Sequence, residues 1–216
     1  MTLDGTNTWV LRAAPGAPAV VIDPGPADPG HFAAITADGP IGSVLITHAH
    51  PDHVEGLADF LEHSGAQLNG DHHGLAITAL ETPGHTADSV CFVIEHAGER
   101  VIATGDTILG RGTTVVAWPD GDLSDYLRSL RELAAYEGVV ALTGHGPALA
   151  DCAVAARFYL RHRAARLDQV VEVLAAGVTG ADAIVDALYA DLEPQLRPAA
   201  QWSVQSMLAY LERERP

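Results

Sequence analysis

The chain has 216 residues, a mass of 22.6 kDa, 48% hydrophobic residues and 19% charged residues. This composition is typical of one folded domain, with or without a short appended module, and excludes a disordered, collagen-like or disulfide-rich chain. The formal net charge is −16, with 12 basic residues that are all arginine, and there are 11 histidines. Because nucleic acids and anionic membranes are attracted by patches of Lys and Arg, this acidity opposes a general affinity for either.

The cysteines and the start of the chain bear on its location. Cys91 and Cys152 are too few for a disulfide framework, and we expect them to be reduced structural thiols. The first seven residues lack the basic start and apolar run of a secretion signal, and no stretch approaches the roughly 18 apolar residues of a membrane span. We therefore expect a cytoplasmic protein that does not associate with a membrane.

Short apolar runs separated by Gly, Pro and Asp dominate the chain up to about residue 150 and predict strands. The predicted strands are Thr8–Arg12, Ala19–Asp23, Ser43–Thr47, Ala76–Leu80, Ser89–Glu95 and Arg100–Thr104. The predicted helices between them are Pro29–Ala37, Val54–His63 and Leu123–Tyr136, the last with Asp122 as its N-cap. Beyond Pro147 only helices are predicted, namely Asp151–Ala176, Thr179–Ala190 with Thr179 as N-cap, and Pro198–Arg213. The sequence thus predicts an α+β domain over residues 1–150 and a small helical module over 151–216.

Four possible metal ligands stand within six residues after a predicted strand: His48, His50, Asp52 and His53. A His-x-His pair at a strand end presents two imidazoles, and an Asp-His pair at the start of the next helix can face the same pocket. Imidazole and carboxylate are ligands that suit zinc, iron and manganese. Three further candidates follow other strand-like segments and stand beside glycines, which let the backbone bend sharply: His85, Asp106 and His145. The pattern predicts a metal site at the rim of a sheet.

These motifs resemble those of the metallo-β-lactamase superfamily. The stretch THAHPDH matches its HxHxDH signature, and TPGHT, GD and GHG match its later motifs in order. Further stretches, among them GTNTWVL, VIDPGP, GDTILGRG and YLRHR, resemble the LACTB2-like branch, whose members add a small winged-helix-like module. The resemblance implies an αββα sandwich with the site on one edge of two packed sheets. It also implies one metal bound by His48, His50 and His85, a second bound by Asp52, His53 and His145, and Asp106 bridging both.

Such a ligand set implies a hydrolase with two divalent metal ions. Two ions roughly 3.5–4 Å apart can hold a hydroxide between them, because coordination lowers the pKa of water toward about 7. The same ions polarise a carbonyl or phosphoryl oxygen. We expect Asp106 to be catalytic through its charge on both ions, and Asp52 through a hydrogen bond to the nucleophile. Zinc is the expected metal, with iron and manganese as alternatives.

Charge bears on which substrate the site would take. The superfamily's hydroxyacylglutathione hydrolases suggest a small ester or thioester, whereas the LACTB2-like branch implies an endoribonuclease acting on single-stranded RNA. RNA binding depends on cationic grooves and aromatic platforms. Residues 1–150, however, hold 19 acidic and 5 basic side chains, a net of −14, and aromatic residues make up 6% of the chain. We therefore favour a small ester or thioester; an iron-dependent persulfide dioxygenase and a non-enzymatic binding domain are lesser alternatives.

The histidines and arginines outside the motifs have weaker claims to function. Surface or packing roles are expected of His31, His63 and His96, and the adjacent His72 and His73 resemble a ligand pair only locally. One cationic cluster lies in the first helix of the module: Arg157, Arg161, His162, Arg163 and Arg166. A solvated helix face is its expected role, and a phosphate-contacting patch is the alternative. From the resemblance alone, residues 5–7 and 110–112 are expected at the mouth of the site.

Overall fold

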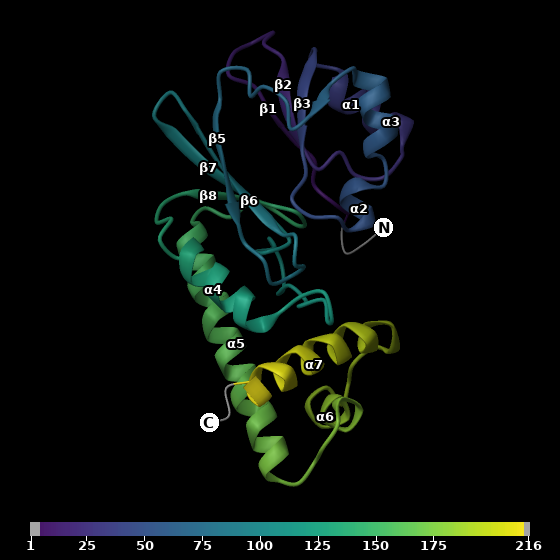
Figure 1. Cartoon of the computed structure of the whole chain (residues 1–216), viewed down its shortest axis with the longest axis vertical. Coiled ribbons are helices and arrows are strands. Elements are labelled where there is room, and N and C mark those ends of the chain that lie inside the picture. The colour runs from purple at the N-terminus through teal and green to yellow at the C-terminus, as the bar shows by residue number, and fades with distance from the viewer. Residues whose placement is uncertain (1–4, 214–216) are drawn as a thin grey trace.

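The computed structural model describes residues 5–213 and contains two four-stranded sheets (Figure 1). The first sheet has the order β1-β2-β3-β4, with bounds Trp9–Leu11, Ala19–Ile22, Ile41–Leu45 and Gln67–Leu68. The second has the order β5-β6-β7-β8, with bounds Ala76–Glu81, Val90–His96, Glu99–Gly105 and Val140–Thr143. Strands β1 and β2 are antiparallel and β3 and β4 continue parallel to β2. In the second sheet β5, β6 and β7 are antiparallel, and β8 runs parallel to β7.

Alternation along the buried strands divides their side chains between separate cores. In β2, Ala19 and Val21 pack in one core with the helices α1 (Pro29–Thr36) and α3 (Leu57–Ser64), whereas Val20 and Ile22 pack between the two sheets. Strand β6 alternates in the same way between the intersheet core and the core that it shares with α4 (Leu123–Leu133) and α5 (Cys152–Ala175). The layers are therefore helix, sheet, sheet and helix, which confirms the predicted αββα sandwich.

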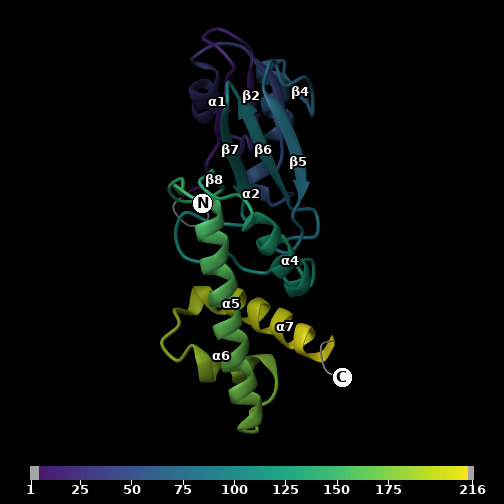
Figure 2. The same ribbon diagram turned by 90° about the vertical axis from the view of Figure 1, so that its left-hand side faces the viewer.

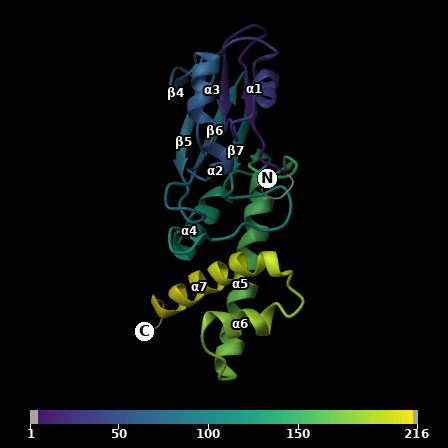
Figure 3. The same cartoon turned by 90° about the vertical axis from the view of Figure 1, so that its right-hand side faces the viewer.

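The C-terminal part is helical throughout the described residues. After α5 come α6 (Ala181–Leu188), a 3-10 turn (Pro194–Leu196) and α7 (Arg197–Arg213). Helix α5 runs from the sandwich into this module, and α7 crosses it (Figures 2 and 3). One apolar cluster continues from β7 through α4 and α5 to α6 and α7. The helical character of the module is as predicted, and the boundary at residue 150 stays a prediction. No helix among residues 5–213 is long and apolar enough to span a bilayer.

The helix predicted over Val54–His63 is interrupted. The structure has a short helix α2 (Pro51–Val54) and then α3, with Gly56 between them. A Cβ on Gly56 would lie 2.7 Å from the backbone carbonyl of Pro26, and the Gly56 amide donates to the Gly25 carbonyl at 2.9 Å. The chain therefore bends at Gly56 to pack against the turn that follows β2. Asp52 and His53 consequently lie on the separate helix α2.

Three further differences concern element ends and short strands. Thr179 is not an N-cap: Gly180 holds that position with φ of +85°, and no side chain bonds to the helix start. Strands β4 and β8 are not among the predicted strands. The two residues of β4 are exposed, and β8 is a strand of four residues. The expected cap at Asp122 is present, with its carboxylate accepting from Asp125 N at 3.1 Å, and both cysteines are free and buried.

Candidate metal centre

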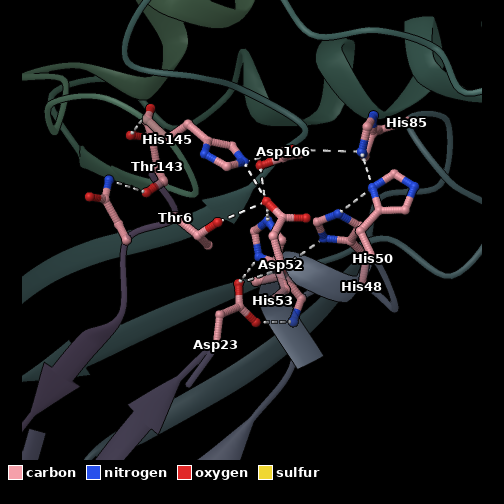
Figure 4. A network of polar contacts seen from close by, with 12 residues as sticks. Thr6, Asp23, His48, His50, Asp52, His53, His85, Asp106, Thr143 and His145 are labelled. Atoms are coloured by element: carbon pink, nitrogen blue, oxygen red, sulfur yellow. Dashed lines mark hydrogen bonds and ion pairs between the residues drawn. The ribbon is translucent and has the colours of Figure 1, made fainter. Parts of the chain in front are cut away.

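The seven predicted ligands lie together at the edge where strands of both sheets end (Figure 4). His48 and His50 follow β3, Asp52 and His53 lie on α2, and the last three follow β5, β7 and β8 respectively: His85, Asp106 and His145. The flanking glycines allow close packing here. A Cβ on Gly105 would lie 2.6 Å from the Thr47 side chain, and one on Gly144 would lie 2.4 Å from Asp106 Oδ1. Glycine is needed at these two positions because other groups of the site occupy the space of a side chain.

The ligand atoms form three overlapping groups that could each hold an ion: His48, His50 and His85; His48, His53 and Asp106; and Asp52, His53 and His145. The first and the third of these groups are called the first set and the second set below. In the first set, His50 Nδ1 lies 3.0 Å from His48 Nε2 and 3.1 Å from His85 Nε2. In the second set, His145 Nε2 lies 3.3 Å from Asp52 Oδ2, and His53 Nε2 lies 3.8 Å from the same oxygen. The Asp106 carboxylate reaches both sets: Oδ2 is 3.3 Å from His145 Nε2 and 3.7 Å from His85 Nε2, and Oδ1 is 3.5 Å from His53 Nε2.

Hydrogen bonds on the outer side of the imidazoles direct their free nitrogens inward. His85 Nδ1 donates to the Val115 carbonyl at 2.6 Å, and His145 Nδ1 donates to the Gly5 carbonyl at 2.9 Å. Because a neutral imidazole carries one proton, these bonds leave the Nε2 lone pairs facing the cluster. At its centre, His53 Nε2 and Asp106 Oδ1 are buried and have no hydrogen-bond partner within residues 5–213. Converging lone pairs and unpartnered buried acceptors fit divalent metal ions.

Asp23, at the end of β2, joins two of the ligands from outside the cluster. Its Oδ2 accepts from His53 Nδ1 at 2.8 Å and from Thr47 Oγ1 at 2.7 Å, and its Oδ1 accepts from Thr47 N at 2.8 Å. Thr47 Oγ1 in turn lies 3.1 Å from His48 Nδ1 and accepts its proton. Asp23 is buried, with 2% of its surface exposed. Asp23 was not among the predicted site residues. Its position gave a signal, because a carboxylate that directly follows an entirely apolar strand is expected to be buried and to need hydrogen-bond partners.

Burial and neighbouring charges divide the histidines of the site into two groups, one with lowered and one with raised pKa values. Burial lowers the pKa of His48 to about 2, and burial also lowers the pKa of His85. Burial opposes the charged form of His53 and His145 too, but nearby carboxylates outweigh it. The Asp106 carboxylate and the hydrogen-bonded Asp23 raise the pKa of His53 to about 9, and the Asp106 and Asp52 carboxylates raise that of His145 to about 10. For Asp106, burial is outweighed by the nearby imidazoles of His145 and His53, which hold its pKa far below the usual range.

Zinc binding to the chelator-treated protein at pH 7 should therefore release about two protons from imidazoles, in addition to those lost by coordinated water. His53 and His145, with pKa values of about 9 and 10, are protonated at pH 7 and must lose their protons to bind a metal, whereas His48 and His85 are already neutral. Binding to the second set should tighten with rising pH, about tenfold per unit for each proton released, until the pH reaches these pKa values. Calorimetric titration in buffers of different ionisation enthalpy measures the count. His145→Asn should lower it by about one, and a count of zero in the native protein would contradict the assignment.

Residues 5–7, which were expected at the mouth of the site, lie beside ligands of the second set. Thr6 Oγ1 donates to Asp52 Oδ2 at 2.8 Å, and Asn7 Nδ2 donates to the Thr143 and Gly146 carbonyls at 3.0 and 2.7 Å. A pocket of about 610 Å³ opens beside Asp52, with Thr6, Pro51 and Glu55 in its lining. On the other side of the ligands, Gly110 N donates to the His145 carbonyl at 2.8 Å, so residues 110–112 also lie next to the site.

The remaining histidines lie apart from the seven ligands. His73 packs over β3, where a Cβ on Gly42 would lie 1.8 Å from its Nε2, and neither His72 nor His73 joins a group of candidate ligands within residues 5–213. His63 packs against Phe32 with ring centroids 6.0 Å apart. His31 Nε2 lies 2.9 Å from Thr8 Oγ1 and borders the pocket beside Asp52.

The arginine cluster does not form one solvated face. Arg163 is buried, donates to the Thr114 carbonyl and lies over the Tyr126 ring at 5.3 Å. Arg157 forms an ion pair with Glu137 at 2.6 Å, and Arg166 lies over the Tyr189 ring. Arg161 is exposed and forms no ion pair within the described part of the chain. The solvated role expected of the cluster was wrong for Arg163, because the loop after β7 packs on α5 and supplies a carbonyl acceptor there.

The two packed sheets and the ligand set at their edge define a metallo-β-lactamase fold. Its family model, the metallo-beta-lactamase superfamily, matches residues 1–72 and 69–145. The chain therefore belongs to the metallo-β-lactamase superfamily. A second family model, the beta-lactamase associated winged helix domain, matches residues 180–215 and confirms the predicted C-terminal module. The finer resemblance to the LACTB2-like branch stays a prediction.

Curated relatives of this chain include fungal thioesterases. Thioesterase PkgB of Emericella nidulans is 32% identical over 197 residues, which cover 81% of this chain and 56% of that protein. The atrochrysone carboxyl ACP thioesterase of Passalora fulva is 34% identical over 200 residues, which cover 81% of this chain and 58% of that protein. The chain thus spans less than two thirds of the length of these relatives. Among solved structures, a metallo-beta-lactamase family protein of Thermus thermophilus shares the fold, with a TM-score of 0.75, 23% identity and coverage of 97% of this chain and 89% of that one.

Proposed function

We propose that this protein is a metal-dependent hydrolase of a small thioester. The observation that carries the proposal is the convergence of five imidazoles and two carboxylates, with outer hydrogen bonds that direct lone pairs into one cluster. The thioesterase names of two curated relatives support the substrate class. A small ester remains the alternative within the same chemistry.

The residues of the site suit two divalent ions, for which zinc is our proposal and iron or manganese the alternatives. His48, His50 and His85 would hold one ion, and Asp52, His53 and His145 the other, with Asp106 shared between them. Divalent ions there would lower the pKa of coordinated water toward about 7 and polarise the substrate carbonyl. We assign catalytic roles to Asp106, which supplies negative charge to both sets, and to Asp52, whose carboxylate faces the second set and is oriented by Thr6.

The arrangement of arginines weighs against RNA as the substrate. A single-stranded RNA groove needs cations along its length, yet the structure buries Arg163 and pairs Arg157 with Glu137. The net charge of −16 opposes the approach of a polyanion as well. A small thioester needs no such groove.

A parallel assay of one thioester and one single-stranded RNA over a salt series tests the proposal. We expect the zinc-loaded protein to hydrolyse the thioester and to leave the RNA intact at every salt concentration. The variant Asp106→Ala, purified in the same way, reports any contaminating nuclease or esterase. RNA cleavage that weakens steeply with salt and is lost in Arg161→Glu would overturn the choice of substrate.

A further inference from the structure

A groove of about 790 Å³ lies between the loop after β7 and the first half of α5. Its walls are largely apolar: Leu109, Leu149, Val154, Ala155 and Phe158 line it. Val154 is 62% exposed and Phe158 is 51% exposed, although both are large apolar side chains. The volume lies within the range of roughly 300–1,000 Å³ that is typical of small-molecule sites.

Helix α5 presents a continuous stripe to this groove. Val154, Phe158 and His162 stand four residues apart and therefore share one helix face, and the Phe158 ring lies parallel to the His162 ring with centroids 6.4 Å apart. The opposite face of the same turns is buried through Ala156, Tyr159 and other residues. A surface helix usually turns its apolar face inward. An apolar stripe on the outer face, bordering a groove, is typical of a binding surface.

The loop that forms the other wall also contacts or holds three of the candidate metal ligands. Gly110 N donates to the His145 carbonyl at 2.8 Å, the Val115 carbonyl accepts from His85 at 2.6 Å, and Leu109 follows Asp106 by three residues. A Cβ on Gly110 would lie 2.1 Å from the Pro147 carbonyl oxygen, so glycine is needed for the loop to lie this close to the site. One wall of the groove therefore contacts the candidate metal centre, while none of the seven ligands lines the groove itself.

Tyr159 of α5 fixes this loop in place. Its hydroxyl accepts from Leu109 N at 3.0 Å and lies 3.2 Å from the Gly112 carbonyl. The position of the loop is thus fixed by a buried tyrosine and not by the exposed side chains Val154 and Phe158. Substitutions of the exposed lining can consequently test binding without dismantling the loop.

We propose that this groove binds the acyl group of the thioester, and that the preferred acyl group is bulky, apolar and carries a carboxylate. This inference rests on the function proposed above. Carrier thiols such as pantetheine and glutathione are rich in amides and need many hydrogen-bonding partners, whereas the groove offers mainly carbon. Its charged groups are Arg111, Arg161 and Asp151, and the Asp151 carboxylate accepts hydrogen bonds from Gly138 N and Val154 N. Burial and the neighbouring Arg163 and Arg166 lower the pKa of His162, which therefore adds no positive charge at neutral pH. In a protein of net charge −16, an anionic substituent needs a local cation, and exposed Arg161 is placed to supply one.

Hydrolysis of three N-acetylcysteamine thioesters tests the acyl preference: propanoyl, 3-(2-naphthyl)propanoyl and 3-(6-carboxy-2-naphthyl)propanoyl. Their reacting carbonyls and leaving group are the same, so differences in kcat/KM report the distal acyl group. We expect the naphthyl substrates to exceed the propanoyl substrate at least tenfold. Val154→Asp should reduce that ratio at least tenfold, and Arg161→Gln should remove the advantage of the carboxyl substituent.

Val171→Asp is the matched control, because Val171 is 46% exposed on the same helix and does not line the groove. It should leave the ratio within twofold of the native value. Equal ratios in Val154→Asp and Val171→Asp, or a native preference for the propanoyl substrate, would overturn the inference.

Binding of the free acid, 3-(6-carboxy-2-naphthyl)propanoate, to chelator-treated protein separates this inference from the proposed function. Calorimetry should show binding that weakens at least tenfold in Val154→Asp and is unchanged in Val171→Asp. If no thioester is hydrolysed but binding depends on Val154, the proposed function fails and the groove assignment stands. If thioesters are hydrolysed but neither binding of the acid nor acyl selectivity changes in Val154→Asp, the groove assignment fails and the function stands.

Discussion

Replacing Asp106 with alanine should abolish turnover and cost the protein at least one metal ion. Its carboxylate approaches both ligand sets, with Oδ2 3.7 Å from His85 Nε2 and 3.3 Å from His145 Nε2. The substitution removes the negative charge that both sets share. The buried His53 Nε2 also loses one of the carboxylates near it. We expect kcat to fall at least about a thousandfold, which corresponds to roughly 4 kcal/mol of barrier.

Metal content of the Asp106→Ala protein should be measured by elemental analysis beside its activity. Asp59→Ala is a suitable control, because Asp59 is an exposed carboxylate on α3 and does not belong to the ligand groups. A thermal melt of each variant separates loss of metal from loss of fold. An Asp106→Ala protein that retains two tightly bound ions and full activity would refute the shared role of this residue.

The ligand positions could be predicted from the sequence because the motifs are local. His48, Asp106 and His145 each stand within three residues after a strand, and strands of both sheets end at one edge. Once the strands are recognised, little freedom remains for where these side chains lie. The pairing of the ligands into two sets was implied by the family resemblance alone and stays a prediction, since Asp106 also groups with His48 and His53.

Features that depend on packing between distant segments were not predictable in this way. A solvated face was expected for the arginine cluster as a whole, but the Arg163 guanidinium donates to the carbonyl of Thr114, in a loop 49 residues earlier in the chain. The break between α2 and α3 at Gly56 depends on its contact with Pro26, which lies in the turn after β2. Neither contact can be read from the hydrophobic periodicity of the sequence, because that periodicity describes the faces of a single helix or strand and not its distant partners.

Replacing Asp23 with asparagine should weaken zinc binding by about 10- to 100-fold, the usual effect of removing a partner behind a ligating histidine. The Asp23 carboxylate accepts three hydrogen bonds, two from Thr47 and one from His53. An asparagine side chain has one acceptor oxygen. If that oxygen faces Thr47 N, the amide NH₂ faces His53 Nδ1, and the His53 proton must move to Nε2, the atom directed at the metal centre. If the amide is reversed, the buried Thr47 N loses its acceptor, at a cost of about 1–3 kcal/mol.

Chelator competition on Asp23→Asn measures this loss. Asp71→Asn is the matched control, because the exposed Asp71 carboxylate lies 3.6 Å from His73 Nδ1 in an Asp-His pair that does not belong to the ligand groups. Zinc affinity within twofold of the native value, or an equal loss in both variants, would contradict the role of Asp23. A second readout separates tuning of His53 from simple support of the fold. Because Asp23 helps to raise the pKa of His53 to about 9, the Asp23→Asn protein should release fewer protons than the native protein on binding zinc at pH 7. A purely structural role for Asp23 would leave that proton count unchanged.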